Sequence, residues 1–510
     1  MRQKSDGPYA SFAAAAETHS AVVYFAGDRA YKLKKPVNLG FLDFSTEELR
    51  AAACVRETEL NRRFAPDVYL GVAKVIAPDN EPCDHLVVMR RMPAQRALSA
   101  LVREGEPADE PVREVARTLA AQHASASRSG QIDQAGGRDA LRGRWKDNVE
   151  QARQVGEAVI GEPAVSEVGS LADQFLAGRR PLFDGRVAAG RIVDGHGDLL
   201  ADDIYCLGDG PRILDCLDFD DRLRWLDGVD DAAFLAMDLE RLGAPSLARR
   251  FIEWYGEFSG DPAPASLRHH YVAYRAFVRA KVACIKHAQG DGSAGDDARR
   301  LTELTLRHLR AGAVTMVLIG GLPGTGKSTL AGAVADRLGW TVLASDRVRK
   351  ELAGVSPRQS AASAYATGIY TSEWTERCYA ELLHRARMLL AHGESVILDA
   401  SWITESQRAD AARVADDVSA QLVQLRCDAP QDLARKRLMT RHGSLSDADG
   451  AIARQMAAVM DPWPSATTVG SAQDAAGAGE VAGLARALEV IRPQGSEHVW
   501  RVGRPVMLPG

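Results

Sequence analysis

The chain has 510 residues, of which 46% are hydrophobic and 26% charged, and 63 basic against 68 acidic side chains give a net charge of −5. A chain of this length exceeds one hydrophobic core, so we expect two to four domains. The near balance of charge excludes a global positive field that would recruit nucleic acid or an anionic membrane. It does not exclude a local basic groove.

The first 95 residues alternate strands with one helix. Residues 20–35 alternate around a Gly-Asp turn and predict a β-hairpin. A Ser-Thr start followed by two glutamates predicts a helix over residues 45–64. Two further strands are expected near residues 69–76 and 86–92. This order is typical of the small lobe of a protein-kinase-like fold, which we assign to residues 1–95.

The next part of the chain is mostly helical. A helical pattern extends from residue 97 to about residue 180, and helices resume from residue 227 to about residue 312. Between them, residues 191–219 predict short strands around a loop. We therefore assign residues 96–312 to a large, mostly helical lobe.

From residue 313 onward the pattern alternates strands and helices. Strands are expected near residues 341–344, 395–399 and 420–426, so residues 313–492 predict a parallel-sheet domain. The tail at residues 493–510 is rich in Gly and Pro and predicts an extended surface segment.

The parallel-sheet domain opens with the sequence VTMVLIGGLPGTGKST at residues 314–329. An uncharged strand, a G-x4-G-K-S loop and a helix in this order predict a phosphate-binding loop for ATP or GTP, because glycines turn backbone N–H groups toward an anion. Lys327 would reach the outer phosphates, and Ser328 would ligate Mg²⁺. The residues expected to bind nucleotide here are Gly321, Gly324, Thr325, Gly326, Lys327, Ser328 and Thr329.

Polar residues at the following strand ends complete this candidate site. Asp346 is placed to accept a hydroxyl proton, and Arg349 lies one turn later to hold the substrate or the transferring phosphoryl group. Asp399, at the end of the strand SVILD, would hold Mg²⁺ through water or bond the loop serine. Arg437 and Arg441 lie in an Arg-rich stretch that predicts a lid closing over the phosphates.

A second set of carboxylates lies in the first half. Asp198 ends the motif His-Gly-Asp, Asp203 follows five residues later, and Asp215 ends the strand RILD. Phosphoryl transfer needs a carboxylate beside the attacking hydroxyl and oxygen ligands for Mg²⁺, and this spacing supplies both. The downstream Asp227 and Asp231 are interpreted as helix-cap and scaffold carboxylates.

With AYKLKKPVNLGFLDFS near its start and HGDL later, the chain resembles the aminoglycoside phosphotransferase-like kinases over residues 15–310. The resemblance implies a two-lobed kinase-like fold with ATP in the cleft. In that pattern Lys32 is the phosphate-pairing lysine and Glu57 its helix partner, with Lys34 and Glu59 as competing assignments. The resemblance also implies the following roles: Asp198 as catalytic base, Asp203 as metal ligand, and Asp215 with Asp218 as the metal-binding segment.

The sequence departs from this family at two places. The small lobe has no GxGxxG motif and carries Thr-His-Ser at residues 18–20 in its place. Asp203 stands where the family has an asparagine, which adds a negative charge near the triphosphate. Because of these departures, three interpretations of this half of the chain remain: a slow kinase, a kinase with altered metal use, or a nucleotide sensor.

Residues 313–492 resemble the small P-loop kinases that include polynucleotide kinase, zeta-toxin-like and gluconate-type sugar kinases. The whole chain thus resembles bifunctional proteins that join an aminoglycoside phosphotransferase-like kinase to a P-loop kinase. The fold class expected is α/β and α+β: a two-lobed protein-kinase-like fold followed by a P-loop NTPase parallel-sheet domain.

The resemblance implies an ATP-dependent phosphotransferase with ATP and Mg²⁺ as cofactors and a hydroxyl of a small molecule as acceptor. The alternatives are a polynucleotide 5′-hydroxyl kinase, or a nucleotide-sensing regulatory protein with one degenerate kinase site. Aminoglycoside modification ranks lower, because this fold also serves other hydroxyl acceptors.

The surroundings of the protein can be predicted from what the sequence lacks. It has no apolar run of 18 residues and only a poor signal peptide, so no membrane partner is expected. The seven cysteines are scattered and form no CxxC pair, which argues against disulfides or zinc and favours a cytoplasmic location. The sequence indicates no oligomeric state.

Overall fold

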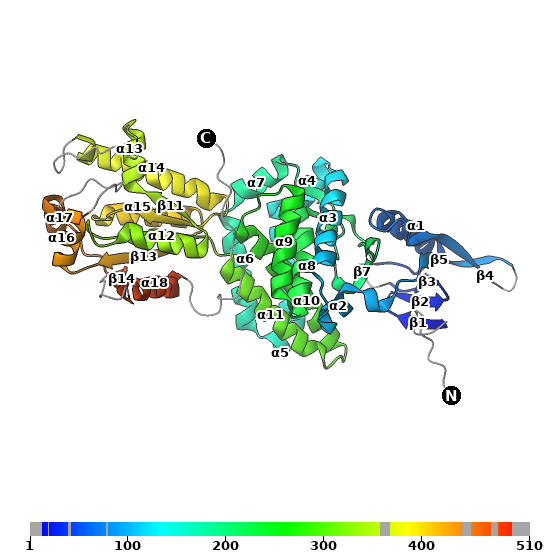
Figure 1. The fold of residues 1–510 in the computed structure, drawn as a ribbon. Coiled ribbons are helices and arrows are strands. Elements are labelled where there is room, and N and C mark those ends of the chain that lie inside the picture. Colours follow the sequence, from blue (N-terminus) through cyan, green and yellow to red (C-terminus); the bar gives the residue numbers. More distant parts are fainter. Residues whose placement is uncertain are drawn as a thin grey trace. The chain divides into compact units, whose positions relative to one another are not determined.

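The computed structural model describes residues 13–18, 20–38, 42–77, 80–356, 368–440, 450–470 and 478–491. The chain forms two compact units (Figure 1). The first unit comprises residues 1–161, 184–263 and 271–305, and the second comprises residues 162–183, 264–270 and 306–510. The finer boundaries expected from sequence remain predictions.

The first unit begins with a five-stranded antiparallel sheet in the order β1-β2-β3-β5-β4. Its strands are β1 (Ala13–Glu17), β2 (Ala21–Ala26), β3 (Arg29–Lys34), β4 (Tyr69–Ile76) and β5 (Pro82–Arg90). The predicted hairpin is confirmed as β2 and β3, and Gly27 supplies the positive φ of 57° that their turn requires.

Helix α1 (Glu47–Arg62) packs against β4 and β5 and was predicted nearly to its first residue. Thr46 is its N-cap, with a side-chain oxygen that accepts the N–H of Leu49. Cys54 on its buried face meets a small core that includes Val68 and Val87. This packing leaves the face of α1 that carries Glu57 next to β3.

The helices after the sheet are α2 (Leu98–Glu104), α3 (Asp109–Ser125), α4 (Gly130–Gly136), α5 (Arg138–Ile160), α6 (Glu162–Ala177), α7 (Arg180–Ala188), α8 (Gly228–Arg241), α9 (Pro245–Ser259), α10 (Ala265–Ala288) and α11 (Ala294–Ala311). Between α7 and α8 lie two small antiparallel sheets, β6 (Ile192–Asp194) with β9 (Trp225–Asp227) and β7 (Ile204–Leu207) with β8 (Gly210–Ile213). Short 3₁₀ turns are η1 (Ala94–Arg96), η2 (Ala201–Asp203) and η3 (Asp221–Leu223). The loops between these short strands carry the predicted carboxylates.

The second unit contains a five-stranded parallel sheet in the order β11-β12-β10-β13-β14. Its strands are β10 (Thr315–Gly320), β11 (Thr341–Ala344), β12 (Val396–Asp399), β13 (Gln421–Asp428) and β14 (Thr467–Gly470). Its helices after β10 are α12 (Lys327–Leu338), α13 (Ser345–Leu352), α14 (Ser372–Ala391), α15 (Glu405–Asp417), α16 (Gln431–Thr440), α17 (Gly450–Ala458) and α18 (Ala478–Ile491), with η4 (Gly368–Tyr370) before α14. Helices α12 and α18 cover one face, and α14 and α15 cover the other (Figure 1).

Strand β10 lies in the middle of this sheet, and every residue of it is buried. The strand order reverses at β10, between β12 and β13, so the loop after β10 opens at the point where parallel α/β sheets bind ligands. The three strands expected after β10 are confirmed as β11, β12 and β13. Strand β14 and helix α18 were not predicted.

Two other expectations concern the surroundings and the tail. Among the residues described, none of the helices is both long and apolar enough to cross a bilayer. The tail predicted at residues 493–510 lies outside the described residues.

Candidate active sites

Two lysines of β3 and one glutamate of α1 form a buried ion-pair network in the first unit. Lys32 Nζ lies 2.8 Å from Glu57 Oε1 and 2.7 Å from Asp215 Oδ1. Lys34 Nζ lies 2.8 Å from Glu57 Oε2 and 2.8 Å from Asp218 Oδ2. Glu57 therefore holds both lysines, because residues two apart on a strand point to the same face.

Burial makes this network electrostatically strong. Glu57 is 1% exposed; burial opposes its ionisation, yet the two lysines hold its pKa below the usual value. Burial likewise opposes the charge on Lys32, but Asp215 and Glu57 raise its pKa well above the usual value. The competing Glu59 is exposed, so Glu57 is the helix partner. Lys32 is the lysine that reaches Asp215.

The segment that carries Asp215 is held in an unusual backbone conformation. Asp215 has a φ of 62°, in the left-handed region that non-glycine residues rarely adopt. Its N–H donates to the Tyr69 hydroxyl at 3.1 Å, and the next N–H, of Cys216, donates to Asn61 Oδ1 at 2.8 Å. These two hydrogen bonds hold the strained backbone of Asp215 in place at the candidate site.

A buried carboxylate anchors the loop that precedes Asp198. Asp231 accepts the N–H groups of His196 at 2.6 Å and of Gly197 at 2.9 Å. His123 Nε2 lies 3.0 Å from the same carboxylate, and His123 Nδ1 lies 2.8 Å from the Tyr255 hydroxyl. Asp231 is therefore a scaffold group, as predicted. Sequence reasoning missed the contributions of His123 and Tyr255, since they come from α3 and α9.

Asp227 also matches its predicted structural role. It caps α8 by accepting the N–H of Val229 at 2.9 Å, and it pairs with Arg186 at 2.5 Å. The pair is almost completely buried, so Asp227 is tied to the scaffold of the large lobe.

Asp198, Asp203 and Asp215 lie close enough to influence one another's ionisation. Burial, with a further contribution from Asp215, raises the pKa of Asp198 to about 6, while Arg279 opposes the shift. Burial and the charges of Asp215 and Asp198 raise the pKa of Asp203 well above its usual value. This mutual repulsion fits a site for a divalent cation, which prefers carboxylate oxygens. Within the described ranges, however, no cluster of three His, Cys, Asp or Glu side chains already has metal-binding geometry.

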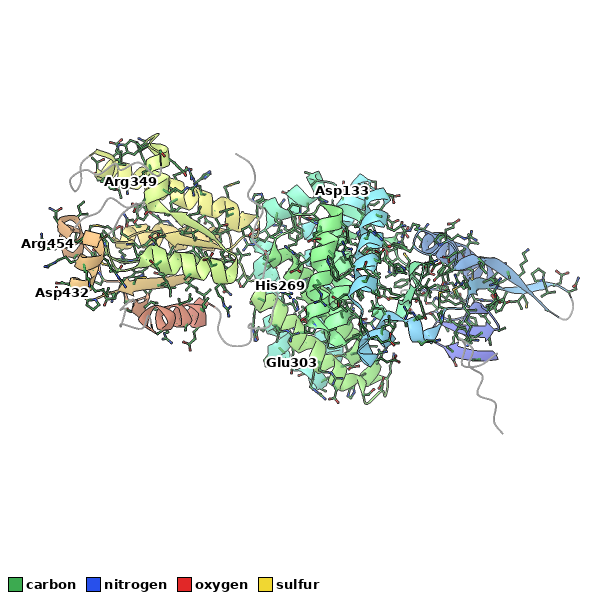
Figure 2. The ribbon with its side chains drawn as sticks, viewed as in Figure 1. Asp133, His269, Glu303, Arg349, Asp432 and Arg454 are labelled. Carbon is green, nitrogen blue, oxygen red and sulfur yellow. The ribbon has the colours of Figure 1, made fainter. Side chains whose placement is uncertain are left out.

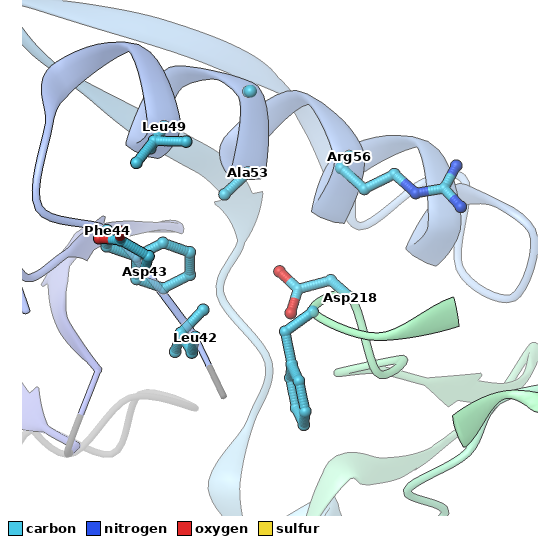
Figure 3. A pocket seen from close by; sticks show the side chains of 9 residues that line it. Leu42, Asp43, Phe44, Leu49, Ala53, Arg56 and Asp218 are labelled. Carbon is cyan, nitrogen blue, oxygen red and sulfur yellow. The ribbon is translucent and has the colours of Figure 1, made fainter. Parts of the chain in front are cut away.

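Asp218 does not join these three carboxylates. It is bonded to Lys34 and lines a separate hollow beside α1 (Figure 3). Asp218 therefore belongs to the ion-pair network of the two lysines. These contacts do not support its predicted role as a metal ligand.

The loop after β10 has the conformation expected of a phosphate-binding loop. Gly321, Gly324 and Gly326 have φ values of 133°, 84° and 92°. A Cβ at Gly321 would lie 2.5 Å from the Cys427 carbonyl oxygen, and one at Gly324 would lie 2.6 Å from the Ala434 carbonyl oxygen. Only glycine fits such close approaches, and the resulting cradle suits an anion.

The remaining loop residues start α12. Lys327 is its first residue, and its Nζ donates to the Leu322 carbonyl at 3.2 Å. Thr325 Oγ1 donates to the same carbonyl at 2.7 Å. Ser328 and Thr329 are exposed in the first turn, where helix N–H groups and a hydroxyl are available to a phosphate and its metal ion.

Two predicted carboxylates lie at the same sheet edge. Asp399 ends β12, is 7% exposed and is in register with Ile319 of β10 and Ala344 of β11. Asp346 lies in the first turn of α13, directly after β11. Because the carboxyl ends of parallel strands share one edge, both residues lie at the edge of the sheet from which the phosphate loop starts.

The predicted arginines have different surroundings. Arg349, labelled in Figure 2, is 6% exposed. It donates to the Ile369 carbonyl at 2.8 Å and to Thr375 Oγ1 at 3.2 Å, and its guanidinium lies over the Tyr370 ring. These contacts tie α13 to the start of α14. Arg437 of α16 reaches the Gly324 carbonyl at 3.5 Å, above the phosphate loop. Arg441 lies outside the described residues.

Comparison with known proteins finds one family match and a close relative. Residues 316–463 match the family described as an AAA domain. The uncharacterised protein Rv2004c of Mycobacterium tuberculosis is 43% identical over 456 residues, covering 89% of this chain and 92% of that protein.

The chain belongs to the family of this mycobacterial protein. The part that matches the AAA domain, residues 316–463, includes the glycine-rich loop after β10 and most of the parallel sheet.

Similar solved structures include two kinases. A choline/ethanolamine kinase family protein from Mesorhizobium loti is 16% identical, with a TM-score of 0.39, covering 60% of this chain and 93% of that chain. A sugar kinase from Janibacter is 17% identical, with a TM-score of 0.27, covering 37% of this chain and 99% of that chain.

Proposed function

We propose that the protein is an ATP-dependent phosphotransferase with two nucleotide sites, which transfers a phosphoryl group to a hydroxyl of a small molecule. The proposal rests on one arrangement in each unit. In the first unit Lys32 pairs with carboxylates, and in the second unit Lys327 follows a loop of glycines with positive φ. Each arrangement is suited to hold a triphosphate beside an acidic side chain.

In the P-loop domain the backbone N–H groups and Lys327 would hold the phosphates. Ser328 and Asp399 would hold Mg²⁺, which when bound neutralises charge on the phosphate oxygens. Asp346 would accept the proton of the attacking hydroxyl. Arg437, which already lies over the loop, would stabilise the transferring group, with Arg441 as its predicted companion.

In the kinase-like unit Lys32 would bind phosphate oxygens while Glu57 orients it. Asp203 and Asp215 would hold Mg²⁺. Asp198, with a pKa of about 6, is ionised at neutral pH and basic enough to accept the acceptor's proton.

The short turn between β1 and β2 favours a second candidate function, a nucleotide sensor in the kinase-like unit. Lys35 Nζ bonds Glu17 at 2.6 Å and the Thr18 carbonyl at 2.6 Å, so a lysine clamps the turn where kinases carry a glycine-rich loop. A clamped turn would cover the phosphates less closely, which is compatible with binding but slows transfer.

The test is phosphate transfer from labelled ATP to fractionated metabolite pools, with Asp198→Ala and Asp346→Ala compared in parallel. Loss of transfer in one variant assigns the active half. Binding without transfer in either half would support the sensor, and transfer to 5′-hydroxyl oligonucleotides would support a polynucleotide kinase.

A further inference from the structure

A hollow of about 290 Å³ lies beside α1 and borders the ion-pair network, because Asp218 belongs to both (Figure 3). Helix α1 forms one wall, and the segment at residues 42–44 and the pair Asp218 and Phe219 form the others. Its volume is close to the lower limit of small-molecule pockets, roughly 300 Å³.

The walls of the hollow are mostly apolar. Leu42, Phe44 and Ala53 contribute to them, together with Leu49 and Phe219. Leu49 is 42% exposed and Phe219 is 41% exposed, although both are large apolar side chains. An occupant with an apolar body would remove this surface from water, which favours binding.

The charge that faces the hollow is negative. Figure 3 shows the carboxylate of Asp218 pointing into it, whereas the guanidinium of Arg56 points away and bonds a carboxylate of η3 at 2.9 Å. Asp43 already accepts the N–H of Ser45 at 2.9 Å. Lys34 holds Oδ2 of Asp218, and Oδ1 accepts no hydrogen bond within the part of the chain that the structure describes.

We propose that this hollow binds a small molecule with an apolar body and one ammonium group. The ammonium would bond Asp218 Oδ1, and the body would pack between Phe44 and Leu49. A carboxylate or phosphate ligand is disfavoured, since Asp218 would repel it.

The ligand would also act on the nucleotide cleft, a step that rests on the function proposed for Lys32. Asp218 holds Lys34, Lys34 holds Glu57, and Glu57 holds Lys32, with each contact at 2.8 Å. An ammonium on Oδ1 would neutralise part of the Asp218 charge and so weaken the attraction between Asp218 and Lys34. Lys34 would then interact more strongly with Glu57, and Glu57 would hold Lys32 less strongly. Lys32 then becomes more available to phosphate, and the amine raises nucleotide affinity.

The first experiment titrates benzylamine into the full chain and follows binding by ligand-observed NMR, with benzyl alcohol as the uncharged counterpart. We expect benzylamine to bind at least about tenfold more tightly, because a charge-assisted hydrogen bond adds to the same apolar body. Equal binding of the two probes would overturn the proposal.

Variants locate the site. Ala53→Phe fills the hollow and should weaken benzylamine binding about tenfold, as should the smaller Ala53→Leu if the first variant does not fold. Asp218→Asn should make benzylamine and benzyl alcohol bind alike. Leu70→Ala, on the exposed side of β4, is the matched control and should leave binding unchanged. Undiminished binding in a folded Ala53 variant would refute this location.

The second experiment measures ATP affinity in Lys327→Ala, where only the kinase-like cleft remains, with and without benzylamine. A higher affinity with the amine supports the coupling, and an unchanged affinity refutes it. If the amine binds but ATP does not, the proposed function of this cleft fails while the ligand site stands.

Discussion

Replacing Glu57 by Gln tests the ion-pair network most sharply. The substitution keeps the shape of the side chain but removes the charge that two lysines share. Lys34 is 4% exposed and would be left with Asp218 alone, and Lys32 with Asp215 alone. Breaking a buried ion pair typically costs about 3–5 kcal/mol. Because each lysine keeps one partner, we expect the lower end, about 3 kcal/mol.

Hydrogen exchange is the suitable assay, since a single melting temperature is poorly defined for a chain with several domains. A loss of about 3 kcal/mol should speed exchange in β3 and α1 about a hundredfold. Glu59→Gln, at an exposed position on the same helix, should change exchange little. Equal effects of the two variants, or exchange in Glu57→Gln close to wild type, would refute the network's importance.

Three further outcomes are expected. Gly324→Ala should abolish binding of a fluorescent ATP analogue to the P-loop domain, because its Cβ would lie 2.6 Å from a carbonyl oxygen, whereas Gly332→Ala meets nothing within 4 Å and should bind normally. In Lys327→Ala, kcat/KM should fall as the pH drops below about 6, since burial raises the pKa of Asp198 to about 6 and its protonated form cannot accept a proton. Asp231→Ala leaves two buried N–H groups unpaired and should speed exchange in the loop that carries Asp198.

The phosphate loop was predictable because its strand, glycines, lysine and helix are consecutive. The same holds for α1, whose capping residue and first turn are local signals. By contrast, the bond between Lys32 and Asp215 joins residues 183 positions apart. The resemblance to a known family assigned both residues to one cleft but did not indicate a bond between them.

Other features depend on packing that sequence spacing does not encode. Spacing placed Arg349 one turn after Asp346. In the structure its guanidinium donates to the Ile369 carbonyl of η4 and to Thr375 of α14, which spacing could not indicate. Asp218 follows Asp215 closely in the chain, yet the left-handed backbone at Asp215 turns the segment so that Asp218 meets Lys34. The four-residue strand β14 was too short to stand out.

Nucleotide stoichiometry tests the central claim most directly. Equilibrium dialysis of the full chain against labelled ATP and Mg²⁺ should give two ATP molecules per chain, and one in each of Lys32→Ala and Lys327→Ala. A wild-type value of one, or complete loss of binding in either single variant, would contradict the account of two independent triphosphate sites.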